Sequence, residues 1–148
     1  MNRILLAIDG SDHSERAALL AGELSGGMDA PVDVVNVVSE SSLVTAGPIH
    51  DYARIEKTAI SQRELLKSLG ADLVVQAANR VREAGGDVDN TDVLIGSPAH
   101  EIVRYAEDRE ADCIVMGRRG LGDVGGILMG SVSHKVGHLT ERTLVTTE

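Results

Sequence analysis

Glycines gather in one short stretch of the sequence, from 117 to 131, which reads GRRGLGDVGGILMGS. Because glycine has no Cβ, its backbone amides can come close to the oxygens of a phosphate or a ribose. The stretch ends where the pattern predicts a helix starting at Ser131, and the N–H groups and positive dipole end of such a helix favour anions. These residues indicate a loop that binds a phosphate-bearing ligand.

Two well-known nucleotide motifs do not account for this loop. Gly120, Gly122 and Gly125 match G-x-G-x-x-G, but that fingerprint must join a strand directly to its helix, with an acidic residue about 20 positions later. Here the match starts inside a loop after the fourth predicted strand, and too few residues follow for the other half of a dinucleotide fold. A P-loop needs a lysine before Ser131, and the sequence has none there.

A third candidate is SGGMDA at 25–30, which is close to the SGGxDS loop of ATP pyrophosphatase-type enzymes. That loop belongs between the first strand and the first helix. Here the segment follows the first predicted helix and lies at the opposite edge of the sheet. We interpret Ser25-Gly26-Gly27 as the stop of that helix followed by a turn.

The elements that must position the glycine loop alternate along the chain. Apolar runs predict strands, and residues with helical spacing predict helices. We expect Asp12 or Ser14 to cap the first helix, Pro98 to open the third, and Gly70 to be a candidate kink or break in the second. The expected strands cover 3–8, 32–38, 87–96, 111–117 and 143–147, and the expected helices cover 13–24, 51–84, 98–110 and 131–139.

This alternation predicts an α/β fold with a mainly parallel sheet covered by helices on both faces. We expect one Rossmann-like, doubly wound domain over residues 1–148, with five strands in the order 3-2-1-4-5. Ligands of such sheets bind at the carboxyl edge, where the winding reverses. Asp9-Gly10-Ser11 leaves the first strand at that edge, as the glycine loop leaves the fourth.

The spacing Gly117-x-x-Gly120, nine residues and then Gly130-Ser131 resembles the ATP-binding signature of the universal stress protein family at every fixed position. Three further segments are similar to that family: AIDGSDHS at 7–14, IGSPAHEIVRYAEDREADCIVMG at 95–117 and GSVSHKV at 130–136. The resemblance extends over the whole chain.

The resemblance implies a bound adenine nucleotide: ATP, or ADP or AMP, with Mg²⁺ held through the phosphates and not by side chains. Asp9 matches the residue that binds the ribose hydroxyls, and the backbone of Val37 matches the position that contacts adenine. Arg118 and Arg119 either offset phosphate charge or are solvated. The expected nucleotide-binding set is Ala7, Ile8, Asp9, Val37, Met116, Gly117, Arg118, Arg119, Gly120, Gly130, Ser131, Val132 and Ser133.

The composition of the chain limits its expected binding partners and its expected compartment in the cell. Its net charge of -9 opposes binding to nucleic acid or to an anionic membrane. The single cysteine, Cys113, excludes an intrachain disulfide, and its apolar surroundings predict a buried, inert thiol. With no signal peptide and no run of about eighteen apolar residues, we expect a cytoplasmic protein.

The sequence contains no evident catalytic set, so three functions stay open. The first is a regulatory, stress-response module that binds ATP, forms a homodimer and acts on a protein partner that the sequence does not identify. The second is a slow ATPase or nucleotide-transfer enzyme, and the third is a scaffold with a vestigial loop.

His134 and His138 suit a metal pair, but without a third ligand we interpret them as surface or core histidines. His13 lies near the expected pocket, and the unusual last strand, TLVTTE, leaves the dimer geometry open.

Overall fold

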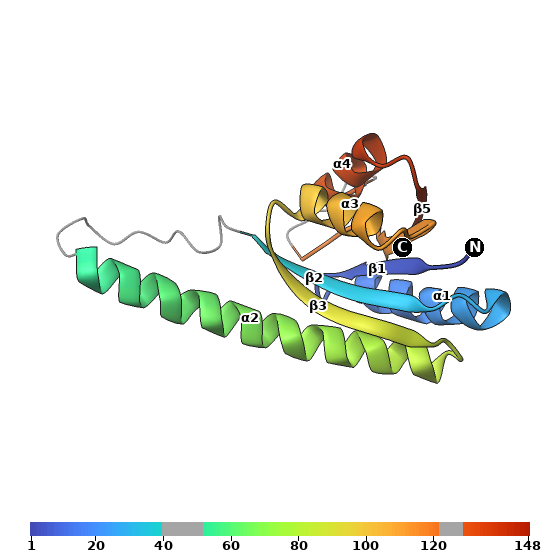
Figure 1. Cartoon of the computed structure of the whole chain (residues 1–148), viewed down its shortest axis with the longest axis horizontal. Helices are drawn as coiled ribbons and strands as arrows, with labels where there is room; N and C mark the ends of the chain where they lie inside the picture. Colours follow the sequence, from blue (N-terminus) through green and yellow to red (C-terminus); the bar gives the residue numbers. More distant parts are fainter. Residues whose placement is uncertain (40–51, 122–128) are drawn as a thin grey trace.

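The computed structural model describes residues 1–39, 52–121 and 129–148, and for residues 52–61 it describes the backbone alone. Strands and helices alternate along the chain, as the sequence predicts (Figure 1). The elements are β1 (Ile4–Ile8), α1 (Asp12–Met28), β2 (Val32–Ser39), α2 (Tyr52–Glu83), β3 (Val88–Gly96), α3 (Pro98–Asp108), β4 (Cys113–Gly117), α4 (Ser131–Leu139) and β5 (Thr143–Thr147).

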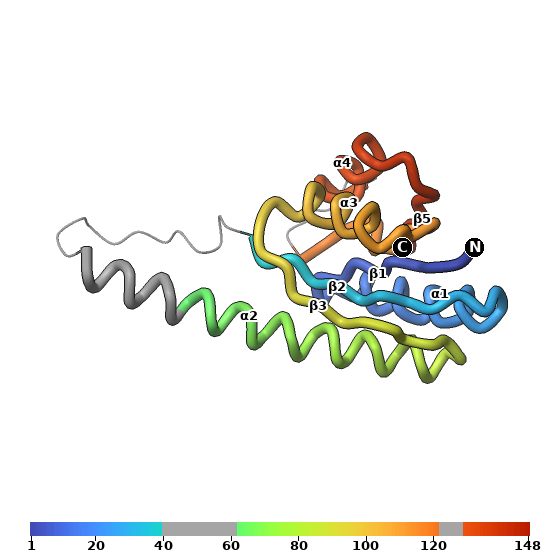
Figure 2. The backbone as a smooth tube through the Cα atoms, in the orientation of Figure 1, coloured from blue at the N-terminus to red at the C-terminus, as the bar shows by residue number. Residues whose placement is uncertain are grey.

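The five strands form one sheet in the order β3-β2-β1-β4-β5, and every pair of neighbours is parallel. This confirms the predicted doubly wound, Rossmann-like fold. β1 lies in the centre, with α1 and α2 on one face of the sheet and α3 and α4 on the other (Figure 2). The carboxyl ends of β1 and β4 are therefore neighbours, as the position of the glycine loop requires.

The core is built from aliphatic side chains that alternate between the two faces of the sheet. In β1, Leu6 packs with α1 and α2, whereas Leu5 packs with α3 and α4, and both are fully buried. Because strands of a parallel sheet are covered on both sides, they are continuous apolar runs in the sequence. Cys113 is buried in this core, and burial raises the pKa of its thiol, so the group stays protonated at neutral pH.

The first helix differs from the prediction at both ends. Its N-cap is Ser11, whose Oγ accepts a hydrogen bond from the Ser14 amide, and not Asp12 or Ser14. The helix also continues through Ser25-Gly26-Gly27 to Met28 and ends on Asp29, which adopts a left-handed conformation with φ 52°. The SGGMDA segment is therefore largely helical, so its predicted stop and turn is wrong.

The physical reason is that glycine here serves helix packing. A Cβ on Gly22 would lie 2.4 Å from the carbonyl oxygen of Val81, and one on Gly26 would lie 2.7 Å from that of Gly85. Both glycines let α1 approach the end of α2 more closely than any larger residue would. The contact offsets the weak helix propensity of glycine, about 1 kcal/mol against alanine.

Of the two alternatives for Gly70, a kink or a break in the second helix, the break is wrong. Gly70 does not split α2, which is one helix from Tyr52 to Glu83. A Cβ at Gly70 would lie 2.8 Å from both Asn36 Oδ1 and Val93 Cγ1, so the glycine allows α2 to lie directly on β2 and β3.

Within the part of the chain that the structure describes, no helix combines the length and the apolar character that crossing a membrane requires.

Candidate functional site

A cavity of about 270 Å³ opens at the carboxyl edge of the sheet, between the ends of β1 and β4 and the start of α4. The structure brings the predicted site residues together here, with Arg118 as the exception. Those that line the cavity are Ala7, Ile8, Asp9, Val37, Met116, Gly117, Arg119, Gly120, Gly130, Ser131, Val132 and Ser133.

Asp9 connects the two segments that meet at this edge. Its Oδ1 accepts a hydrogen bond from the Ser11 amide at 3.0 Å, and its Oδ2 accepts one from the Leu121 amide at 3.2 Å. A Cβ on Gly120 would lie only 2.5 Å from Asp9 Oδ2. Gly120 is therefore required for the carboxylate and the glycine loop to approach each other.

Gly117 has a different neighbour. A Cβ at this position would lie 2.8 Å from His13 Cβ, so the glycine makes room for the first turn of α1. His13 itself faces the end of β5: its Nδ1 lies 3.3 Å from the carbonyl oxygen of Thr147, and Thr147 Oγ1 donates to the His13 carbonyl at 2.8 Å. His13 supports the loop from behind and does not line the cavity.

The two arginines of the loop place their side chains differently. Arg118 acts through its backbone: its amide donates to the Thr147 carbonyl, and its carbonyl accepts from the Gly130 amide, each at 2.7 Å. Its guanidinium pairs with Glu148. Among the residues that the structure describes, the Nε atoms of both arginines are buried without a hydrogen-bond partner, but Arg119 lines the cavity and Arg118 does not. Of the pair, Arg119 alone is placed to meet an anion in the cavity.

The first turn of α4 forms the opposite wall. Gly130 is the N-cap residue, and within the described ranges no side chain caps the helix. Ser131 is exposed at the cavity, whereas the buried Ser133 donates its hydroxyl to the carbonyls of Arg118 and Gly130, at 2.7 and 3.1 Å. The N–H groups at this helix end, with its positive dipole, provide an environment that favours an anion.

The remaining wall is apolar and comes from β2, α3 and β4. β2 continues past Asn36, its last residue paired with β1, so the backbone of Val37 lies beyond that ladder. Asn36 Nδ2 donates to the Ile8 carbonyl at 2.9 Å and so holds the end of β1. Five residues that line the cavity were not predicted from the sequence: Ser14, Val35, Pro98, Ile102 and Leu121. The period-two spacing of Val35 and Val37 was a signal for one of them.

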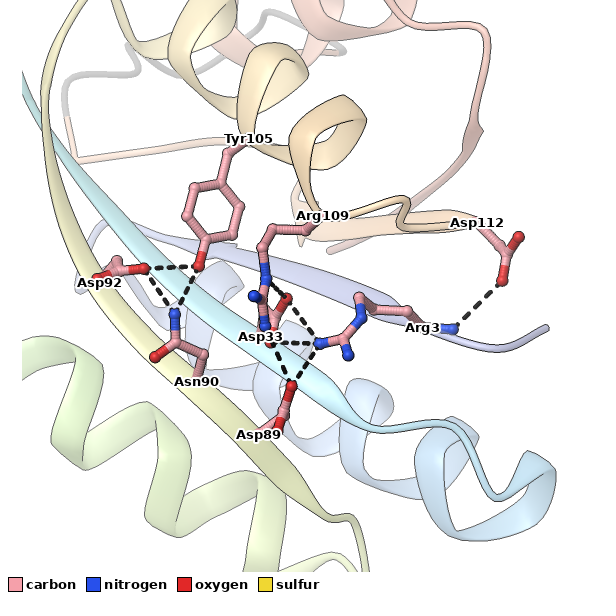
Figure 3. A network of polar contacts seen from close by, with 8 residues as sticks. All are labelled: Arg3, Asp33, Asp89, Asn90, Asp92, Tyr105, Arg109 and Asp112. Atoms are coloured by element: carbon pink, nitrogen blue, oxygen red, sulfur yellow. Dashed lines mark hydrogen bonds and ion pairs between the residues drawn. The ribbon is translucent and has the colours of Figure 1, made fainter.

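A second polar cluster lies at the opposite, amino edge of the sheet (Figure 3). Asp33 is fully buried and accepts hydrogen bonds from two guanidiniums: from Arg3 Nη1 at 2.9 Å and from Arg109 Nε at 2.9 Å. The hydrogen bonds and charge of Asp33 raise the pKa of Arg109. Asp89 pairs with both arginines, so the charges balance. This cluster holds the end of α3 against the sheet. In the sequence, it is indicated by the aspartate inside the apolar run VDVVNVV.

Metal binding by acidic and sulfur ligands finds no support in the described ranges. Among residues 1–39, 62–121 and 129–148, no group of three or more histidine, cysteine, aspartate or glutamate side chains is gathered in a way that could hold a metal ion.

Comparison with solved structures shows the same fold. The universal stress protein UspA from Lactobacillus plantarum aligns with a TM-score of 0.84 and 20% identity, over 99% of this chain and 97% of that one. A universal stress protein from Archaeoglobus fulgidus in complex with dAMP aligns with a TM-score of 0.65 and 21% identity, over 100% and 98%. One in complex with cAMP aligns with a TM-score of 0.67 and 22% identity, over 99% and 96%.

Sequence comparison is more specific. The chain is 32% identical over 140 residues to the universal stress protein YxiE of Bacillus subtilis, covering 94% of this chain and 93% of the relative. The family model described as the universal stress protein family matches residues 1–146. Together with the shared fold, these matches show that the chain belongs to the universal stress protein family.

Proposed function

We propose that this protein binds an adenine nucleotide in the cavity at the carboxyl edge of the sheet and acts as a regulatory module of a stress response. The observation that carries the proposal is the meeting of three features in one cavity: the Asp9 carboxylate, the glycine loop and the uncapped first turn of α4. They supply, in order, an acceptor for ribose hydroxyls, close backbone approach, and an anion site.

The ribose would bind at Asp9. A carboxylate with two oxygens has more acceptor sites than the two backbone amides of Ser11 and Leu121 use. Ribose hydroxyls can therefore add to these hydrogen bonds or replace the one from Leu121. Either arrangement keeps the sugar next to Gly120, where a side chain would not fit.

The adenine would lie against the apolar wall formed by Val35, Ile102 and Met116. An adenine ring needs apolar contact on its faces and a few hydrogen bonds at its edge. The backbone of Val37, beyond the ladder with β1, would provide hydrogen bonds of this kind. This arrangement directs the base toward β2 and the phosphates toward α4.

The phosphates would lie between Gly117, Gly120 and the first turn of α4. The Ser131 hydroxyl and the Arg119 guanidinium, whose Nε has no partner in the described part of the chain, fit this role. In a protein of net charge -9, Arg119 would offset part of the phosphate charge. ATP, ADP and AMP all suit this arrangement, and Mg²⁺ would be held through the phosphates of the longer two.

Related structures support the choice of an adenine nucleotide. Two universal stress proteins of the same fold are described in complex with cAMP and with dAMP. Both ligands join adenine to a sugar and one phosphate, and these are the parts that our arrangement positions. We propose that the nucleotide is ATP itself, because the spacing of Gly117, Gly120, Gly130 and Ser131 resembles the ATP-binding signature of the family.

A homodimer completes the proposal. β5 is an edge strand of the sheet, and its residues from Leu144 to Thr147 are only partly buried. An exposed edge invites pairing with a second strand, and a second copy of β5 would cover it. We also place the protein in the cytoplasm, a compartment that suits a buried, reduced Cys113.

The decisive experiment is calorimetry with AMP, ADP and ATP, with and without Mg²⁺, on wild type and on Gly130→Asp. Gly130 is an N-cap residue with φ -67°, and aspartate is among the best N-cap residues, so the variant should fold. Its carboxylate would repel phosphate and abolish ATP binding. The matched variant Gly130→Asn caps the helix without the charge and should retain more of the affinity.

The outcomes separate the candidates. Absence of nucleotide binding by wild type, and of nucleotide in the purified protein by mass spectrometry, would refute the proposal. ATP binding with phosphate release above background, lost in Gly130→Asp, would favour an ATPase over a regulatory module. Light scattering of the purified protein measures the dimer directly.

A further inference from the structure

Two histidines on α4 point their ring nitrogens at each other. His134 and His138 are one helical turn apart, and both are exposed. Their Nε2 atoms are 3.3 Å apart, their ring centroids are 4.5 Å apart, and the ring planes meet at 78°. The spacing i, i+4 places both rings on one face of the helix.

The face that carries this pair is turned away from the core. Ser133 and Val136 are the buried residues of α4, with exposures of 2% and 0%. Since successive helix residues are rotated by about 100°, His134 and His138 lie about 200° from Val132 and Val136 respectively. The buried side fixes the helix, so the helix in turn fixes the two imidazoles next to each other in solvent.

The separation of the two nitrogens has a specific chemical meaning. Zinc binds imidazole nitrogen at about 2.0–2.1 Å in tetrahedral geometry, which puts two nitrogens on one ion about 3.3–3.4 Å apart. The observed 3.3 Å equals that spacing. This contact is a hydrogen bond between the rings, in which one Nε2 carries the proton. A bound ion would take the place of that proton, with each neutral imidazole carrying its proton on Nδ1 and without rearrangement of the helix.

We propose that His134 and His138 form a two-histidine chelate for a divalent transition-metal ion such as Cu²⁺, Ni²⁺, Co²⁺ or Zn²⁺. In the described ranges, no third histidine, cysteine, aspartate or glutamate gathers with this pair. Two imidazoles with the other positions filled by water are sufficient for a chelate on an exposed helix. The negative charge of the protein as a whole favours cations near its surface.

This inference does not depend on the proposed nucleotide site. The chelating nitrogens belong to imidazoles that do not line the cavity, and imidazole selects borderline metals over Mg²⁺, which prefers oxygen ligands. The selectivity also follows the ligand type. Cu²⁺ should bind more tightly than Ni²⁺, and Ni²⁺ more tightly than Co²⁺.

The test is calorimetric titration of the full chain, without a polyhistidine tag or nucleotide, with Ni²⁺ and with Cu²⁺. We expect one ion per chain and loss of this binding in both His134→Gln and His138→Gln. The matched control is His100→Gln, because His100 is also an exposed helix histidine but its ring nitrogen faces Ser97 Oγ. That variant should bind as wild type does.

A second measurement distinguishes ligation from unfolding of a variant. Circular dichroism should show the same spectrum for wild type and both glutamine variants, because the two rings are exposed. The visible absorption of bound Cu²⁺ should report nitrogen ligation in wild type and disappear in the double variant. Equal Ni²⁺ binding by wild type and the double variant, or binding of Mg²⁺ as tight as that of Ni²⁺, would overturn the proposal.

Discussion

The amide of Leu121 donates a hydrogen bond to Asp9 Oδ2 over 3.2 Å, although 112 residues separate the two in the sequence. This contact joins the glycine loop after β4 to the turn after β1, at the point where the winding of the sheet reverses. The same carboxylate is the group that we assign to ribose. Nucleotide binding and loop position are therefore expected to depend on one side chain.

Asp9→Ala should weaken ATP binding by about ten- to a hundredfold, because a hydrogen bond to a charged group contributes about 1.5–3 kcal/mol. Calorimetry of ATP and of 2′,3′-dideoxy-ATP with both proteins forms a double-mutant cycle. If Asp9 binds the ribose hydroxyls, the substitution should cost much less with the dideoxy nucleotide.

Asp12→Ala is the matched control for this prediction. Asp12 lies in the first turn of α1, three residues later, and it does not line the cavity. It should retain the affinity of wild type. An equal loss with the two nucleotides in Asp9→Ala would argue that Asp9 only holds the loop and does not touch the sugar.

Gly120→Ala should both weaken nucleotide binding and lower the free energy of unfolding. The new Cβ would lie 2.5 Å from Asp9 Oδ2, so the carboxylate or the loop must move, at a cost of about 1–3 kcal/mol. Urea denaturation and calorimetry measure the two effects. Gly27→Ala is the contrast: its Cβ meets nothing within 4 Å, so it should stabilise α1 by about 0.5–1 kcal/mol.

The order and type of the elements could be predicted because each strand is a continuous apolar run and each helix has a periodic apolar face. What could not be predicted is the role of individual glycines. Gly22, Gly26 and Gly70 are helix-weakening residues when the sequence is considered locally, and close contact with another element explains each of them. Such contacts depend on residues far away in the sequence, such as Val81 and Val93, so a local pattern does not contain them.

The cavity shows the same division. The glycine loop and Asp9 could be placed at one edge because they follow strands whose ends must meet, whereas the glycine signature and the ribose role of Asp9 came from the resemblance to the family. Arg118 was included in the site because it occupies, with Arg119, the variable pair between Gly117 and Gly120, but its guanidinium pairs with Glu148 and its backbone supports the loop. The side-chain direction of a loop residue depends on the local fold and on the C-terminal strand. Neither the local fold around Arg118 nor its position next to the C-terminal strand could be derived from the spacing of the glycines.

Asp33→Ala should lower the free energy of unfolding by about 2–3 kcal/mol, because it leaves the guanidiniums of Arg3 and Arg109 without their buried carboxylate. Both guanidiniums are partly exposed, which keeps the cost below that of a fully buried charge. Urea denaturation measures it. Asp89→Ala removes an exposed carboxylate from the same cluster and should cost less; an equal cost would contradict the importance of burial.

Because of the raised pKa of Tyr105, we expect the free energy of unfolding to fall at alkaline pH. Its burial, together with the hydrogen bond that its hydroxyl donates to Asp92 Oδ2 at 2.6 Å, raises its pKa well above the ordinary value near 10. Above pH 10 the unfolded chain therefore loses a proton that the folded chain keeps. The unfolded state binds fewer protons, so the free energy of unfolding falls as pH rises, by at most about 1.4 kcal/mol per pH unit.

Urea denaturation between pH 8 and pH 11 measures this slope, and tyrosinate absorbance measures the titration itself. Both are best done on a Tyr52→Phe background, because Tyr52 is the other tyrosine of the sequence. Adding Tyr105→Phe should lower stability at pH 8, through loss of the hydrogen bond to Asp92, and should flatten the alkaline decline. A decline of unchanged slope in that variant would assign the alkaline sensitivity to other groups, of which the buried Cys113 thiol, whose pKa is also raised, is the first candidate.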